Sequence, residues 1–409
     1  MIISIKDNWQ LAEADHSAYV DDRVQHFIGH FSSRTAVDPH LSDFLEEVRN
    51  TAKAGEIEEL LEAVVSKTPA GKAVVAGLPA IQALLAKHEG LCTGPHGKDD
   101  FRHHLRKQVV VVGRRPDKFD FVRDRVDSYV SGRAARAAAD PVTAQFLTAN
   151  CVGLGSADFP VLLDTIAVFE KCERGLKNAA SRKAFRANIA QVFDYDHFVK
   201  KDGADWNAFE LCRHSRSRIC PYCHQAYAFT VFKDDGTGAV RPTLDHFLPQ
   251  KQFPHLALSL QNLVPSCYTC NSNLKGKTDF HAIPHLHPLR DAEAFEFFID
   301  VPGKSIVDLR SDFENLKSLA QLKIRCTPSV AMAVQNSLWT FLVEERYNET
   351  VPEAVAFASL RMDLDSRRKE YSDIFRGRSE AHLLRFDRHA YRDALLGKMY
   401  AGIFDQFQS

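Results

Sequence analysis

The sequence predicts an α+β protein that is mostly α-helical and carries a small strand-rich module near its centre. Apolar residues recur every three to four positions over much of 1–185 and 301–409, which is typical of amphipathic helices. Between these regions, β-branched and aromatic residues alternate on both sides of a turn-forming cluster at 234–238. Four of the nine cysteines also fall there, in two Cys-x-x-Cys pairs. These patterns predict an N-terminal domain (1–185), a central domain (186–300) and a C-terminal region (301–409).

The composition of the 409-residue chain predicts a folded protein of two or three domains. Hydrophobic residues make up 45% and charged residues 26%, which is ordinary for folded proteins. The formal net charge is −1, so a polyanionic partner would have to be held by local basic patches. The opening "MIISIKDNWQLAEADH" has early acidic residues and no apolar run, and no stretch approaches the ~18 apolar residues of a membrane span. We therefore expect a cytoplasmic protein with reduced thiols.

The N-terminal domain is predicted to be helical, with a role in sensing, partner binding or substrate recognition left open. Segments 41–50, 55–67 and 161–180 each place apolar residues at helical spacing. The four valines of "KQVVVVGRRPDK" (107–118) predict one short buried strand.

Helices also flank and follow the strands of the central domain. The segment "WNAFELCRHSRSR" (206–218) predicts a helix, and "TCNSNLKGKTDF" (269–280) predicts a short one ended by Gly276. Segments 329–349 and 352–371 predict further helices in the C-terminal region.

The two Cys-x-x-Cys pairs are candidate metal ligands. Cys220 and Cys223 form one pair and Cys267 and Cys270 the other, with 43 residues between them. Two such turns would complete a closed tetrahedral zinc site. The gap is longer than in simple zinc ribbons, and unbound thiols are the alternative. Redox chemistry would need a thioredoxin-like βαβ context, which is missing. We expect a structural zinc ion that staples the central domain.

Polar residues follow in a fixed order around these cysteines. Asp245 and His246 are adjacent in "LDHFLP", Asn262 comes 16 residues after His246 in "QNLVPSC", and Asn271 directly follows the last cysteine. This set, with "CPYCHQAY" and "HPLRDAEAFEFFI", resembles the HNH endonucleases, which are zinc-stabilised ββα-metal nucleases. It is similar to a bacterial branch associated with phage defence. The resemblance covers roughly residues 200–300.

The chain departs from the family pattern at one point. The family usually has Asn-x-x-Lys-Gly, whereas one extra residue here separates Asn271 from Lys275. Either Asn271 or Asn273 could therefore correspond to the family's asparagine, and direct attachment to Cys270 favours Asn271.

These residue types suit phosphodiester hydrolysis, which needs an activated water and stabilisation of negative charge. His246 is the candidate general base, because its ordinary pKa is near neutrality. Asp245 and Asn271 offer hard oxygen ligands to a catalytic Mg²⁺ or Mn²⁺, whereas four thiolates select zinc. By resemblance, Asn262 would brace the loop that carries His246 without touching substrate.

Nearby basic residues are candidate contacts to a nucleic-acid backbone. Lys275 lies one helical turn after Asn271 and would reach a phosphate, and Lys277 would assist. Three arginines precede the first cysteine pair: Arg213, Arg216 and Arg218. Ordinary solvation is the alternative for all five side chains.

The resemblance implies a metal-dependent endonuclease that serves as an anti-phage defence effector. We expect its substrate to be DNA rather than RNA. A partner ATPase or other defence protein is the expected protein partner, and no membrane is expected. The alternative is a catalytically inactive zinc-stapled nucleic-acid-binding or adaptor module in a defence complex. The intact Asp245–His246 pair and both asparagines favour the enzyme.

Overall fold

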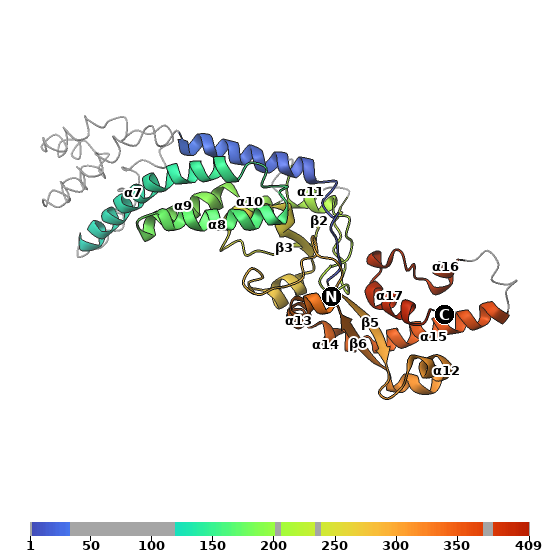
Figure 1. Ribbon diagram of the computed structural model, residues 1–409. Helices are drawn as coiled ribbons and strands as arrows, with labels where there is room; N and C mark the ends of the chain where they lie inside the picture. The colour runs from blue at the N-terminus through green and yellow to red at the C-terminus, as the bar shows by residue number, and fades with distance from the viewer. Residues whose placement is uncertain (1, 33–118, 201–205, 234–238, 371–378, 409) are drawn as a thin grey trace, which may run out of the picture. The chain divides into compact units, whose positions relative to one another are not determined.

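The chain forms two compact units in the computed structural model (Figure 1). The described residues are 2–32, 119–200, 206–233, 239–370 and 379–408. Unit 1 comprises Met1–Asp21, Gly153–Asp164 and Phe193–Ser409, and unit 2 comprises Asp22–Val152 and Thr165–Val192. The helices predicted at 41–50 and 55–67, the strand at 107–118 and the turn at 234–238 lie outside the described residues.

The described residues of unit 2 form helices. Its elements are α7 (Phe119–Asn150), α9 (Ala179–Val192), part of α8 (Phe159–Gly175) and part of a helix over residues 13–32. Phe146, Phe169 and Phe185, one from each labelled helix, form an aromatic core with ring centroids 5.3 to 5.9 Å apart. The predicted helix at 161–180 is confirmed as α8, although it ends at Gly175 and a new helix follows.

The described residues of unit 1 form three two-stranded antiparallel sheets. The pairs are β1 (Val231–Phe232) with β2 (Ala239–Val240), β3 (Thr243–His246) with β4 (Leu263–Ser266), and β5 (Phe295–Asp300) with β6 (Gln321–Cys326). In the β3–β4 pair, Asp245 lies opposite Val264 and His246 opposite Leu263. A short helix, η4 (Thr269–Lys275), follows this pair, so the predicted strand-rich centre with its helix is present.

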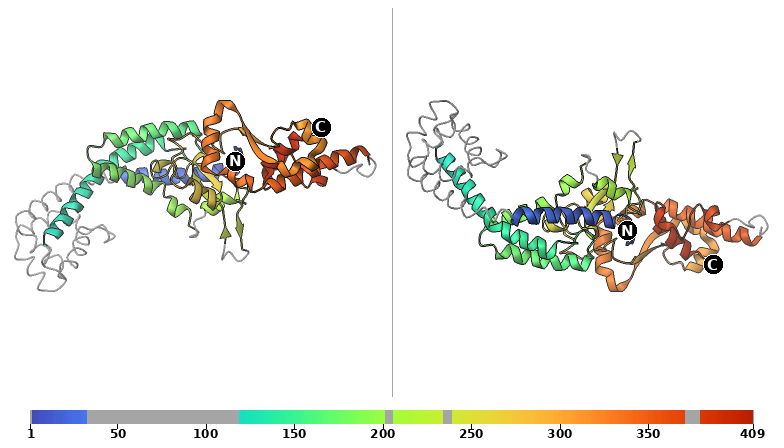
Figure 2. Two further views of the ribbon diagram at one scale, coloured as in Figure 1. Left: turned by 90° about the horizontal axis from the view of Figure 1, so that it is seen from below. Right: turned by 90° about the horizontal axis from the view of Figure 1, so that it is seen from above.

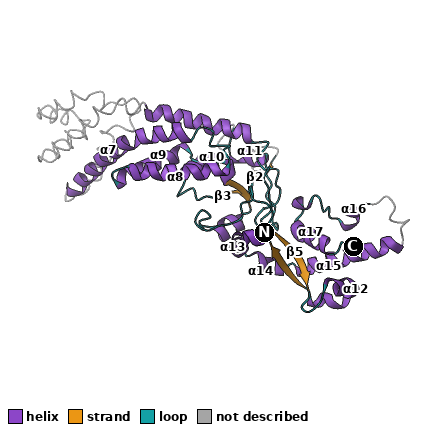
Figure 3. Ribbon diagram, in the orientation of Figure 1, coloured by secondary structure: helices purple, strands orange, loops and turns teal. Residues whose placement is uncertain are grey.

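Among the described residues of unit 1, helices account for more of the chain than strands do (Figure 3). They are α10 (Tyr195–Phe198), α11 (Ala208–Arg213), α12 (Ile306–Leu316), α13 (Ala331–Thr340), α14 (Val343–Asn348), α15 (Val351–Glu370), α16 (Glu380–Leu384) and α17 (Gly397–Gln406). Short 3₁₀ turns cover Pro254–Leu256, Leu260–Asn262, Lys317–Leu319, Pro328–Val330 and Tyr391–Asp393. The described residues are mostly helical (56%) with small sheets, which agrees with the predicted α+β class. Among the helices described, we find none with the length and hydropathy that a bilayer crossing requires.

The predicted helices of unit 1 agree with the structure to different degrees. The helix at 352–371 is α15, but the one at 329–349 is broken into α13 and α14. The break occurs at Leu342, whose φ of 49° is left-handed and therefore cannot continue a right-handed helix. The helix predicted at 206–218 is confined to α11.

The unit boundaries differ from the predicted divisions at 185 and 300, because both ends of the chain pack on the central strands. Ile3 donates its backbone N–H to the Pro221 carbonyl at 2.9 Å, and the Trp9 indole donates to the Leu263 carbonyl of β4 at 2.9 Å. From the other end, α17 lies directly against β5. A Cβ added at Gly402 would fall 2.2 Å from the Phe297 carbonyl oxygen.

Candidate metal centre and active site

The four paired cysteines come together in unit 1. Their sulfur atoms all lie within 4.8 Å of one another, so the predicted convergence is confirmed and the group is able to bind a zinc ion. The first pair lies on a turn closed by an antiparallel bridge between Ile219 and Tyr227. The second pair begins directly after β4 and ends inside η4. Backbone geometry therefore delivers two thiols from each turn.

The spacing of the thiols suits tetrahedral zinc. Cys223 Sγ and Cys267 Sγ are 4.0 Å apart, close to the ~3.8 Å edge of a tetrahedron with ~2.3 Å zinc–sulfur bonds. Cys267 Sγ accepts the backbone N–H of Cys270 at 3.5 Å, and Arg346 of α14 donates Nη1 to Cys270 Sγ at 3.5 Å. Hydrogen bonding with Cys220 lowers the pKa of Cys267 to about 7. The hydrogen bonds of Cys267 favour the thiolate form that zinc requires, whereas desolvation by burial raises the pKa of Cys220.

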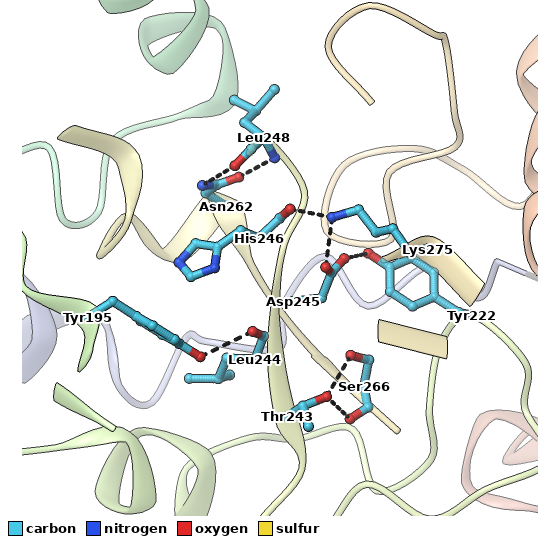
Figure 4. A network of polar contacts seen from close by, with 10 residues as sticks. All are labelled: Tyr195, Tyr222, Thr243, Leu244, Asp245, His246, Leu248, Asn262, Ser266 and Lys275. Carbon is cyan, nitrogen blue, oxygen red and sulfur yellow. Dashed lines mark hydrogen bonds and ion pairs between the residues drawn. The ribbon is translucent and has the colours of Figure 1, made fainter. Parts of the chain in front are cut away.

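Asp245 is buried, and both of its carboxylate oxygens accept hydrogen bonds (Figure 4). Lys275 Nζ donates to Oδ1 at 2.7 Å, and the Tyr222 hydroxyl donates to Oδ2 at 2.6 Å. Tyr222 is itself fully buried and stacks on Phe341, with ring centroids 4.3 Å apart. Two fixed donors thus hold the carboxylate in one orientation.

The predicted phosphate contact of Lys275 needs correction. Its side chain is only 4% exposed, because its ammonium points inward to Asp245. Nζ also donates to the His246 carbonyl and lies 4.8 Å from the centroid of the Phe280 ring. An ammonium with these partners is a counterion of Asp245 in this fold. Lys277, by contrast, is exposed as a phosphate contact would need to be.

His246 is arranged as a neutral imidazole with one fixed nitrogen. Nε2 lies 2.9 Å from the Ala257 carbonyl oxygen. Because a carbonyl only accepts, Nε2 carries the hydrogen and Nδ1 holds the lone pair. Desolvation lowers the pKa of His246 to about 4, so the ring is uncharged at neutral pH. The ring of Tyr195 meets it edge-on, with centroids 4.4 Å apart.

Asn262 holds together two segments of the loop between β3 and β4, one next to His246 and one next to its partner Ala257. The side chain is fully buried; Oδ1 accepts the Leu248 N–H at 2.6 Å, and Nδ2 donates to the carbonyls of Leu248 (3.1 Å) and Leu256 (2.9 Å). Leu248 comes two residues after His246, and Leu256 precedes Ala257, the partner of Nε2. The geometry agrees with the bracing role that the resemblance implies.

The extra residue between Asn271 and Lys275 is accommodated by a π-helix. Helix η4 has π geometry over Thr269–Lys275, and Gly276 donates its N–H to the Asn271 carbonyl at 2.9 Å, five residues back. A π-turn contains one residue more than an α-turn and is common at functional sites. Asn271 is half-buried and Asn273 exposed, so burial favours Asn271 as the inward asparagine.

The three predicted arginines are exposed and precede the turn that carries Cys220 and Cys223 (the zinc turn). Arg213 pairs with Glu210 at 2.7 Å, and Arg216 donates to the Gln10 side chain at 3.0 Å. The guanidinium carbon of Arg218 lies 5.9 Å from the centroid of the exposed Phe229 ring. All three remain at the surface, where a polyanion could meet them.

The oxygens expected to hold a catalytic Mg²⁺ or Mn²⁺ do not form an open site. Both Asp245 oxygens already accept hydrogen bonds, and one of the donors is the Lys275 ammonium. A divalent ion beside that carboxylate would meet like charge. The described residues, as folded, therefore do not fit such an ion at Asp245, and we assign no catalytic step to one.

Sequence reasoning missed the two tyrosines of this site. Tyr222 lies between Cys220 and Cys223, and the Cys-x-x-Cys pattern marks only the two cysteines. Tyr195 lies about 50 residues upstream of β3. The Tyr195 hydroxyl donates to the Leu244 carbonyl at 3.1 Å. Only the position of Tyr222 inside the first pair was a usable signal, since it ties that side chain to the zinc turn.

Comparisons with known proteins give one local similarity. No family model matches the chain, and no solved structure matches it. Over 74 residues, the chain is 34% identical to the Septu protein PtuB of Bacillus thuringiensis. That stretch is 16% of this chain and 28% of the relative, so the chain spans well under half of the curated protein it matches. The chain is thus similar to PtuB over a short stretch only.

Proposed function

We propose that this protein hydrolyses nucleic-acid phosphodiester bonds as an HNH-type endonuclease, with His246 as the general base. The observation that carries the proposal is the state of the imidazole. Its Nε2–H is fixed by the Ala257 carbonyl, and Nδ1 keeps a lone pair on an uncharged ring. A positioned neutral imidazole can accept a proton from an attacking water, and its lowered pKa makes it a weaker base than a solvated histidine.

The supporting residues hold this base in place. Tyr195 packs edge-on against the imidazole. Asn262 bonds the backbone at Leu248, next to His246, and at Leu256, next to the Ala257 carbonyl that fixes the ring. The adjacent Asp245–Lys275 pair fixes the end of β3, because Lys275 also donates to the His246 carbonyl. Preorganisation of this kind is what a general base needs to act without a costly rearrangement.

The surface beside the zinc turn is the proposed place of the nucleic acid. The β1–β2 hairpin extends away from the rest of unit 1 (Figure 2). Tyr227 and Phe229, at its base, are exposed and have ring centroids 5.2 Å apart, next to Arg218. Exposed arginines would contact phosphates and exposed rings would stack on bases. We propose DNA as the substrate in preference to RNA.

A role in defence is the biological setting that we propose. The local match to the Septu protein PtuB supports the defence role that the resemblance implies. We propose that a partner ATPase or another defence protein acts together with this chain.

The second candidate function is a zinc-stapled nucleic-acid-binding or adaptor module that does not cut. One observation favours it: the Asp245 carboxylate has both oxygens engaged by internal donors. Binding without cleavage by the wild-type protein would support this alternative.

Cleavage of supercoiled plasmid separates these functions. His246→Ala should slow cleavage by about 10² to 10⁴, the usual contribution of a general base, with zinc content unchanged. His281→Ala is the matched control, because His281 is an exposed histidine outside the site and should leave the rate unchanged. Reactions with and without added Mg²⁺ belong to the same series. A His246→Ala protein that cuts at the wild-type rate would overturn the proposal.

A further inference from the structure

We propose that Lys275 is the resident cation of Asp245, so that a divalent ion reaches this carboxylate only by competing with the lysine's own ammonium. The inference deepens the proposed nuclease function, because it concerns the carboxylate next to the proposed general base. It rests on contacts inside the site.

The Asp245–Lys275 pair is enclosed and directional. The two side chains are 3% and 4% exposed, and Nζ lies 2.7 Å from Oδ1. Water contributes little screening there, so the attraction is stronger than at a surface. The second oxygen is held by the Tyr222 hydroxyl at 2.6 Å. Every carboxylate oxygen that an ion would seek already has a donor.

The ammonium has further partners that hold it in place. It donates to the His246 carbonyl and lies over the Phe280 ring. Lys275 is the last residue of η4, and Gly276 turns the chain away with a φ of 50°. The π-turn closed by the Gly276–Asn271 bond sets the lysine's direction. Lys277, two residues later, is exposed, and its side chain lies at the surface.

Competition between the two cations has a measurable consequence. With Lys275 in place, its ammonium puts a +1 charge at hydrogen-bond distance from the Asp245 carboxylate. This charge repels an arriving dication. Replacing Lys275 with Met keeps similar bulk but leaves the carboxylate with only the Tyr222 donor. We therefore expect Mn²⁺ to bind Lys275→Met at least about tenfold more tightly than wild type, a change of ~1.4 kcal/mol.

The experiment is a titration of the full-length zinc-loaded protein with Mn²⁺, in which free Mn²⁺ is measured by electron paramagnetic resonance. Lys277→Met is the matched control, since it removes the same charge two residues away at the surface. The double variant Lys275→Met/Asp245→Asn removes the carboxylate and should lose the gained affinity. Lys275→Gln serves as a second variant, because its amide is able to donate to Asp245 without carrying charge.

Tighter Mn²⁺ binding in Lys275→Met and Lys275→Gln, absent from Lys277→Met and from the double variant, supports the inference. Equal affinity in wild type and both Lys275 variants would overturn it, as would a gain that persists without Asp245. The plasmid assay with His246→Ala reports separately on the proposed function. A failure there would leave the Mn²⁺ result on Lys275 unaffected.

Discussion

Replacing Asn262 with Ala should destabilise unit 1 strongly, because one side chain satisfies three buried backbone groups. It bonds the Leu248 N–H, the Leu248 carbonyl and the Leu256 carbonyl. Each buried polar group left without a partner costs about 1–3 kcal/mol. Allowing the loop some relaxation, we expect a loss of about 3–5 kcal/mol in the free energy of unfolding. That is a large fraction of the ~5–15 kcal/mol available to a typical domain.

Urea denaturation followed by tryptophan fluorescence measures this loss in the relevant unit. All three tryptophans, Trp9, Trp206 and Trp339, lie in unit 1. Asn273→Ala makes the same chemical change at an exposed position and should stay within about 0.5 kcal/mol of wild type. If Asn262→Ala costs no more than Asn273→Ala, the bracing role is wrong.

Three more outcomes follow from the same structure. Cys267→Ser should lower zinc content and soluble yield, while wild-type zinc should survive EDTA; metal analysis that finds no zinc in fresh wild-type protein contradicts this. Burial lowers the pKa of His16 to about 4 and of His287 to about 3. The unfolded histidines therefore bind protons first, and stability should fall as pH drops below 6.5 towards 4, by up to about 1.4 kcal/mol per pH unit for each. Urea curves that do not change between pH 7 and 5 would exclude this linkage. Gly402→Ala should lower the melting temperature because its Cβ meets a strand carbonyl, whereas Gly29→Ala has open space and should not; equal effects would refute the packing argument.

The four-cysteine cluster could be predicted, because a Cys-x-x-Cys spacing constrains where its two thiols lie. A Cys-x-x-Cys turn fixes the direction of two thiols, so two turns need only meet, and the four sulfurs do. The bracing by Asn262 was available only through the resemblance. Its partners are backbone groups of leucines, which no residue pattern marks.

The domain boundaries and the lysine's role could not be predicted, for different physical reasons. The N-terminal segment joins unit 1 through hydrogen bonds such as that from Trp9 to the Leu263 carbonyl, 254 residues apart, and periodicity does not report pairings at such distance. For Lys275, helical spacing gave its face but not the direction of a long flexible side chain. The direction follows from the hydrogen bond to the Asp245 carboxylate, whose burial the sequence does not reveal.

The zinc turns and the candidate active site form one mechanical unit, because each turn supplies one of the two partners of Asp245. Tyr222 lies between the first pair of cysteines and donates to Oδ2. Lys275 is the last residue of η4, the helix that contains Cys270, and it donates to Oδ1. A zinc ion that ties the two turns together would therefore fix both donors at once, and its loss would release both. Loss of such an ion would leave the buried Asp245 carboxylate without the fixed positions of its ammonium partner, Lys275, and its hydroxyl donor, Tyr222.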